Sequence, residues 1–306
     1  MLTYDQYPAF LFVAIVAAVY VIAARSLFVA AGVKPSSKYS RWVIRGLAIF
    51  GIGCFAYGYF AEPYWPEVVR VELRTPKFTN IGPPIRIVHI SDVHSDAESR
   101  LEERLPVLIA EQQPDLILFS GDSTNSAAGL PVFRKLMIEL PRIAPTYAVQ
   151  GNWDVGRAHA PQLFDGTGVK ELTARAGGVV LNLRGNRIWL GGASAHRIEG
   201  LQELLTQAPT DAFSIFVYHY PDEIYDVSGK VDLYCAGHTH GGQVALPLYG
   251  ALLTLSRFGK RFEAGLYQVG STSLYVSRGI GMEGGPAPRV RFWARPEITL
   301  YEISRE

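Results

Sequence analysis

The fold of this 306-residue chain is constrained most strongly by a set of apolar runs, each of which ends in a polar residue of a kind that binds metal ions. Three of these runs end in Asp92, Asp122 and Asn152, which follow one another at intervals of about 30 residues. That interval is typical of one strand, a crossover helix and the next strand. The spacing predicts an α/β fold in which the three side chains lie at the carboxyl ends of neighbouring strands, where open sheets of this class bind ligands.

Histidines follow two later apolar runs. The run 213–218 precedes His219, and the run 231–236 precedes a glycine-rich segment that holds His238 and His240. In an extended chain alternate residues point to the same side, so His238 and His240 can direct two imidazoles into one site. Imidazole together with carboxylate suits manganese, iron or zinc better than calcium. We therefore expect a transition-metal site at the ends of these strands.

The order of the motifs resembles a known family, the calcineurin-like metallophosphoesterases, over roughly residues 85–303. The matching motifs are D-x-H at Asp92–His94, G-D at Gly121-Asp122, G-N-x-D at Gly151–Asp154, a lone His219, and G-H-x-H at Gly237–His240. The form G-H-T-H-G-G-Q is similar to a branch of bacterial membrane-linked or exported phosphoesterases, which includes enzymes that cleave the pyrophosphate of UDP-2,3-diacylglucosamine. The resemblance implies a four-layer αββα sandwich of two mixed sheets.

The resemblance also implies two divalent metal ions and the residues that hold them. One ion would bind Asp92, His94, Asp122 and His240. The other would bind Asp122, Asn152, His219 and His238, so that Asp122 bridges the pair. The implied reaction is hydrolysis of a phosphodiester or pyrophosphate bond by a hydroxide between the ions, with catalytic roles for Asp122, Asn152 and His219. Two cations about 3.5–4 Å apart can clamp a phosphoryl group and acidify the water between them.

One position departs from the family pattern. Many members carry histidine at the third position of G-N-x-D, where it protonates the leaving group, and this chain carries Trp153. An indole donates one hydrogen bond but cannot serve as a general acid. The departure favours substrates with good leaving groups over alkyl phosphomonoesters. Two roles for the Trp153 ring stay open, which are packing at the rim of the site and contact with a base or a lipid.

Two more residues are candidates for the reaction. Arg278 comes directly after a predicted strand and before Gly279, where a guanidinium either binds phosphate bidentately or forms an ion pair. His196 follows the segment 191–195 and either supplies the acid that is missing at position 153 or is an ordinary loop histidine.

The N-terminal region predicts a membrane hairpin. The segment 10–31 is almost wholly apolar and long enough to cross about 30 Å of hydrocarbon, and 42–60 gives a second span flanked by aromatic residues. Lys34, Lys38 and Arg41 lie between the spans, so the positive-inside rule predicts a cytoplasmic connection. The protein would then be a multi-pass protein of the cell (inner) membrane with an extracytoplasmic catalytic domain. A signal peptide over the first span and a buried helix pair are the alternatives.

Composition fits one enzymatic domain behind this anchor. We expect the hairpin over 1–61, a proline-rich linker with a possible edge strand over 62–84, and the catalytic domain over 85–306. The 29 basic and 28 acidic residues balance, so no broad basic surface for a nucleic-acid partner is expected. Cys54 and Cys235 lie in separate apolar segments and predict no disulfide.

The regular elements of the domain follow from periodicity. Helices are expected at 98–111, 130–140 and 200–206. Strands are expected at 86–90, 116–119, 147–149, 179–183, 187–191, 213–218, 233–236, 265–269, 273–277 and 298–303.

The leading hypothesis is a membrane-anchored two-metal phosphoesterase. A lipid-linked nucleotide pyrophosphate hydrolase of the UDP-diacylglucosamine type is the first alternative, although the enzymes of that type act on the cytoplasmic side. The second alternative is a metal-binding scaffold without turnover, since Trp153 replaces a catalytic histidine.

Overall fold

Two six-stranded mixed sheets form the centre of the computed structural model, which describes residues 20–21, 38–283 and 289–306. The first sheet has the order β1-β14-β2-β3-β4-β5 and the second has the order β12-β13-β9-β8-β7-β6. The first comprises β1 (Glu67–Thr75), β2 (Ile85–Ile90), β3 (Leu116–Phe119), β4 (Thr146–Ala148), β5 (Lys170–Glu171) and β14 (Glu297–Arg305). The second comprises β6 (Val179–Leu183), β7 (Asn186–Ala193), β8 (Phe213–Tyr218), β9 (Leu233–Ala236), β12 (Gly265–Val269) and β13 (Thr272–Val276).

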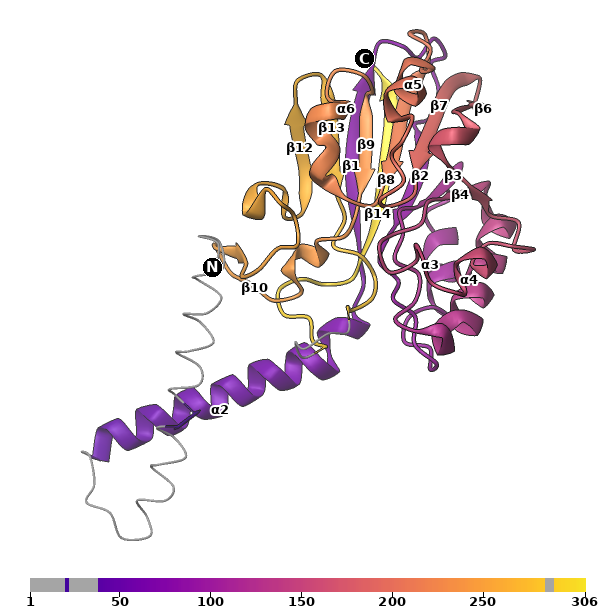
Figure 1. The fold of residues 1–306 in the computed structure, drawn as a ribbon. Helices are drawn as coiled ribbons and strands as arrows, with labels where there is room; N and C mark the ends of the chain where they lie inside the picture. The colour runs from indigo at the N-terminus through magenta and orange to yellow at the C-terminus, as the bar shows by residue number, and fades with distance from the viewer. Residues whose placement is uncertain (1–19, 22–37, 284–288) are drawn as a thin grey trace.

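Helices cover the outer face of each sheet, which gives the predicted four layers (Figure 1). The helices are α3 (Leu105–Ala110) and α4 (Leu130–Ile143) against the first sheet, and α5 (Leu201–Thr206) and α6 (Ile224–Val227) against the second. The two-residue period of a strand divides the core. In β3, Leu116 and Leu118 face the second sheet, whereas Ile117 and Phe119 face the helices.

The predicted linker contributes a strand to the first sheet. β1 lies at the sheet edge and pairs in parallel with β14 along nine residues, from Glu67 opposite Glu297 to Thr75 opposite Arg305. β14 continues antiparallel to β2. The catalytic core therefore includes residues from Glu67 onward.

The predicted helix over 98–111 is shorter than expected. α3 begins only at Leu105, because the Glu102 carboxylate accepts the backbone N–H groups of Arg100 at 2.7 Å and Leu101 at 3.0 Å and holds this segment in turns. Both cysteines are free, and Cys235 lies in the core between the sheets.

Helix α2 (Lys38–Phe60) runs away from the two sheets (Figure 1). Its last turns pack on the C-terminal segment, where Arg291 N–H donates to Gly58 O at 2.9 Å and the rings of Tyr57 and Phe292 meet edge-on at 6.1 Å. Within the described ranges, no helix combines the length and the apolarity that a membrane crossing requires. The predicted span 42–60 lies within α2. The predicted span 10–31 lies almost entirely outside the described residues.

Candidate metal centre

The loops that follow five parallel strands carry the predicted ligands. These strands are β2, β3, β4, β8 and β9. Five ligand residues adopt left-handed backbone conformations, with φ of 51° at Asp92, 44° at His94, 59° at Asp122, 72° at His238 and 52° at His240. Such conformations are unfavourable for residues other than glycine and concentrate at functional sites. The backbone strain at this edge of the sheets therefore marks a site.

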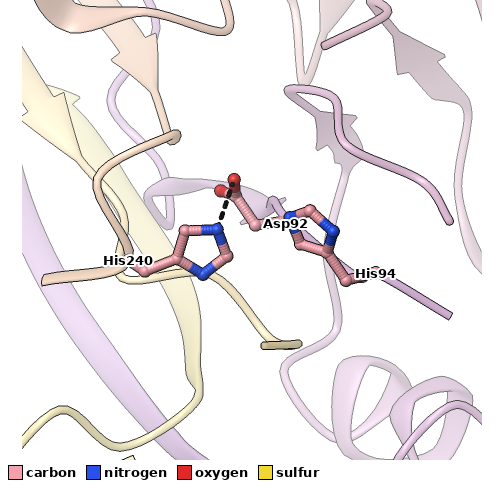
Figure 2. A group of neighbouring side chains, drawn as sticks. All are labelled: Asp92, His94 and His240. Carbon is pink, nitrogen blue, oxygen red and sulfur yellow. Dashed lines mark ion pairs between the residues drawn. The ribbon is translucent and has the colours of Figure 1, made fainter. Parts of the chain in front are cut away.

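Six predicted ligands form two clusters, in each of which the candidate ligand atoms lie within 4.8 Å of one another. The first cluster contains Asp92, His94 and His240, and the second contains Asp122, His219 and His238. Figure 2 shows Asp92 between the two imidazoles of the first cluster, with His240 Nε2 at 3.3 Å from Asp92 Oδ1.

Asp122 lies between the two clusters. Its Oδ2 atom is 3.4 Å from His94 Nε2 in the first cluster and 3.2 Å from His219 Nε2 in the second. This is the position that a carboxylate bridging two ions would take.

Buried atoms without hydrogen bonds test whether metal ions fit these residues. His94 Nε2, His219 Nε2 and Asn152 Oδ1 are all buried and make no hydrogen bond, although the two imidazole nitrogens face Asp122 Oδ2. A buried polar atom that lacks a hydrogen bond costs free energy of folding. Each of these three atoms is also a good ligand atom for a transition metal. The far sides of the imidazoles are fixed, since the Nδ1–H of His94 donates to Asn125 Oδ1 at 3.1 Å and that of His219 to Ser120 O at 2.9 Å. The residues therefore fit two divalent ions.

Glycines in the motifs make room for the carboxylates. A Cβ at Gly237 would lie 2.3 Å from Asp92 Oδ2, and a Cβ at Gly151 would lie 2.1 Å from Asp122 Oδ1. Both distances are far below van der Waals contact, so a side chain at either position would displace a candidate ligand.

Two supporting residues were not assigned from the sequence. Asn125 orients His94, and the Asp154 carboxylate accepts the backbone N–H groups of Gly151, Asp122 and Ser123, each at 2.9 Å. The G-N-x-D motif was the only signal for Asp154, and no signal in the sequence identified Asn125.

Electrostatic coupling joins the central residues. Burial alone would lower the pKa of His219, but the Asp122 carboxylate beside it raises that pKa to about 9. Burial would likewise raise the pKa of Asp122, but His219 and His94 hold it well below its usual value. Burial lowers the pKa of His238 to about 3, so this imidazole is neutral and free to bind a metal.

Trp153 packs beside the first cluster. Its backbone N–H donates to Asp122 Oδ1 at 2.8 Å and its ring lies edge-on to His94 at 5.5 Å. The indole N–H donates to Glu283 Oε1 at 3.1 Å, and Arg157 lies over the ring at 4.6 Å. Trp153 is therefore part of the wall of the site, with its one donor already used.

The two remaining candidates lie outside the ligand clusters. Arg278 forms ion pairs with two carboxylates. One is Glu297, at 2.6 Å from Arg278 Nε, and the other is Glu67. This arrangement corresponds to the ion-pair alternative. His196 is exposed, and its Nε2 lies 2.8 Å from the hydroxyl of Tyr220, whose ring meets that of His238 at 4.4 Å. His196 thus reaches the site only through Tyr220.

Comparisons with known proteins agree with this geometry. The family model described as calcineurin-like phosphoesterase matches residues 85–242. The chain is 32% identical to the uncharacterized metallophosphoesterase YkuE of Bacillus subtilis over 79% of this chain and 87% of that protein. It is 28% identical to the phosphodiesterase YaeI of Escherichia coli over 79% and 90% of the two chains.

Among solved structures, a dimetal phosphatase from Danio rerio aligns with a TM-score of 0.41 and 12% identity, over 65% of this chain and 88% of that one. By the family match and the similarity to YkuE, this chain belongs to the calcineurin-like phosphoesterase family and is a metal-dependent phosphoester hydrolase.

Proposed function

We propose that the chain is a membrane-anchored phosphodiesterase or pyrophosphatase with two divalent metal ions. The observation that carries this proposal is the pair of ligand clusters on either side of Asp122. Asp92, His94 and His240 would hold one ion, Asn152, His219 and His238 would hold the other, and Asp122 would contribute to both. When bound, two such ions polarise a phosphoryl group and lower the pKa of a water molecule.

The protein's part in the reaction is to hold and orient these groups. Donation from Nδ1 of His94 and of His219 fixes each ring so that Nε2 faces Asp122. The backbone N–H of Trp153 fixes the other oxygen of Asp122. These orienting contacts are already made, so these three residues need little reorganisation when a substrate binds.

Trp153 supports a substrate with a stable leaving group. The indole N–H is donated to Glu283, and an indole cannot transfer a proton at neutral pH. A phosphodiester with an acidic leaving alcohol, or a pyrophosphate that releases a phosphate ester, needs no strong acid. The similarity to a phosphodiesterase in Escherichia coli points the same way.

Exposed apolar side chains on α2 support the membrane anchor. Three of these side chains are largely exposed: Ile49 at 70%, Phe50 at 70% and Phe60 at 72%. Such a surface is unfavourable in water and is typical of contact with lipid or protein. Placement in the cell membrane with the catalytic domain outside the cytoplasm follows from the basic residues between the two apolar segments.

A direct assay tests the reaction class. The full chain in detergent is stripped of metal and loaded with Mn²⁺, Fe²⁺ or Zn²⁺, and hydrolysis of bis(p-nitrophenyl) phosphate is compared with that of p-nitrophenyl phosphate. We expect the diester to be preferred, and Asp122→Ala and His240→Ala each to lower its hydrolysis at least about a hundredfold. Asp211→Ala, at an exposed surface aspartate, is the matched control. Unchanged diester hydrolysis in both site variants would refute the proposal.

A further inference from the structure

Five exposed apolar side chains lie on segments next to the ligand loop. They are Leu248, Tyr249, Leu253, Leu255 and Trp293, and we call them the apolar rim. Leu248 is fully exposed, at 109%, and Trp293 is 61% exposed. Isolated apolar residues on a surface are ordinary, but a group of this size on one side of a site is not.

The rim is built on the same backbone as the ligands. Gly242, two residues after His240, packs so closely that a Cβ there would lie 2.6 Å from Leu253 O. The rim therefore lies next to the loop that carries His238 and His240.

A network of contacts fixes the rim in its exposed position. The two short strands β10 (Ala245–Leu246) and β11 (Gly250–Ala251) pair with each other, and Leu248 lies at their turn. Lys260 Nζ donates to Ala251 O at 2.8 Å, and Ser256 Oγ donates to Asp222 Oδ1 at 2.6 Å. The apolar side chains thus point outward from a well-held backbone.

Two rim residues keep bulky side chains where the backbone disfavours them. Leu248 has φ of 67° and Trp293 has φ of 59°, in the left-handed region where glycine or asparagine costs less. The two segments are joined, since Val244 and Phe292 form a β-bridge and Ala245 N–H donates to Phe292 O at 2.8 Å. Large apolar groups at both strained positions point to a function for the surface that they form.

The surroundings indicate which partner covers the rim. The segment 245–262 contains three basic residues, of which Arg257 pairs with Glu223 and Lys260 with Glu263, whereas Arg261 forms no salt bridge within the described residues. Lys260 lies over the Tyr249 ring at 4.2 Å. Aromatic and basic side chains together are typical of the membrane–water interface, and the charge of Arg261 favours anionic lipid.

The rim is also continuous with the anchor helix. Phe292, beside Trp293, packs edge-on against Tyr57 in the last turns of α2. Figure 1 shows β10 and α2 on the same side of the two sheets.

We propose that the apolar rim is a bilayer-contact surface, which rests on the headgroup and upper acyl region of an anionic phospholipid membrane. The metal centre beside it then takes an amphiphilic phosphodiester or pyrophosphate directly from that membrane. The substrate part of this proposal rests on the proposed hydrolase activity, and the bilayer contact does not.

Fluorescence quenching tests the contact without any reaction. The full chain is mixed with vesicles of phosphatidylcholine and phosphatidylglycerol that contain brominated lipid, and the Trp293 signal is obtained as the difference from Trp293→Phe. We expect bromine to quench this signal. The substitution Leu248→Glu should abolish the quenching, whereas Ile81→Glu, at a residue that is 89% exposed on another segment, should leave it unchanged. An unquenched Trp293 signal overturns the proposal and leaves a protein partner as the occupant of the rim.

Hydrolysis tests the delivery of substrate. Metal-loaded protein is assayed with hexadecyl p-nitrophenyl phosphate in the same vesicles and with soluble bis(p-nitrophenyl) phosphate. We expect Leu248→Glu to lower the ratio of vesicle to soluble activity about tenfold or more, since a charge replaces an apolar contact with lipid. An unchanged ratio overturns the delivery of substrate from the membrane. Failure of the native protein to cleave either substrate would instead refute the proposed function, and quenching would still decide the contact.

Discussion

Hydrogen bonds on the far side of each imidazole set how well the site binds metal. Asn125 is the clearest case, because its Oδ1 accepts from His94 and its Nδ2 donates to His94 O at 2.9 Å. We expect Asn125→Ala to weaken metal binding about 10- to 100-fold, as is usual when an outer partner of a ligand is lost. Titration with Zn²⁺ followed by calorimetry measures this, with Asn182→Ala on an exposed strand as the control. Unaltered affinity would show that His94 is oriented by other contacts.

The pair of His219 and Asp122 predicts a pH dependence for the metal-free protein. The pKa of His219 is raised from 6.5 to about 9 in the folded state. The resulting stabilisation, at most about 3 kcal/mol, is complete below pH 6.5 and is lost as the pH rises through about 9. Urea unfolding of metal-free protein at pH 6.5 and 9.5 should show this loss, and His219→Gln should remove it. Equal losses in both proteins would place the titration at another group.

Trp153 predicts a gain of function. The Trp153 ring lies 5.5 Å from the His94 ring, so a histidine at position 153 would place an acid beside the first ligand cluster. We expect Trp153→His to raise hydrolysis of an alkyl phosphomonoester about tenfold or more relative to that of bis(p-nitrophenyl) phosphate, because only the alkyl leaving group needs a proton. Trp153→Phe is the control without an acid. Parallel changes in both variants would mean that ring size, and not proton donation, limits the reaction.

At the scale of the element, strands bounded by turn signals were the easiest to predict. The bounds of β8, β9 and β12 agree with the predicted runs 213–218, 233–236 and 265–269, because these runs have clear turn signals on both sides. The β10–β11 hairpin was not predicted, since strands of two residues carry no periodicity. The predicted start at residue 98 was wrong, because the Glu102 carboxylate accepts the N–H groups of Arg100 and Leu101 and holds them in turns before α3.

Arg291 joins the segments around the site. It is fully buried, and its guanidinium donates to Gly281 O at 2.9 Å, Ala294 O at 2.7 Å and Arg278 O at 2.9 Å. The loop that it holds also covers Asp92, through Gly281 N–H to Asp92 O at 2.6 Å. We expect Arg291→Met to lower the free energy of unfolding by at least about 3 kcal/mol, because several buried carbonyls lose their donors. Urea denaturation measures this against Arg175→Met at an exposed position, and equal stability of the two variants would contradict it.

At the scale of the whole molecule, the sequence predicted the site better than its surroundings. The motifs brought the candidate ligands together because each one follows a strand, and the parallel strands of each sheet end at one edge. The ion-pair partners of Arg278 could not be predicted from the sequence, since Glu67 and Glu297 come from opposite ends of the catalytic core. The link from His196 through Tyr220 depends equally on tertiary packing.

The order of strands in the first sheet has a consequence for biosynthesis. β14 is the last strand of the core in the chain, yet it lies between β1 and β2, which are the first two. During translation, β1 and β2 have left the ribosome long before their common neighbour exists. The first sheet therefore cannot close until residue 305 has been released. Until then the edges of β1 and β2 that pair with β14 remain without a partner strand. Such exposed edges are prone to aggregation, so we expect the nascent chain to bind chaperones.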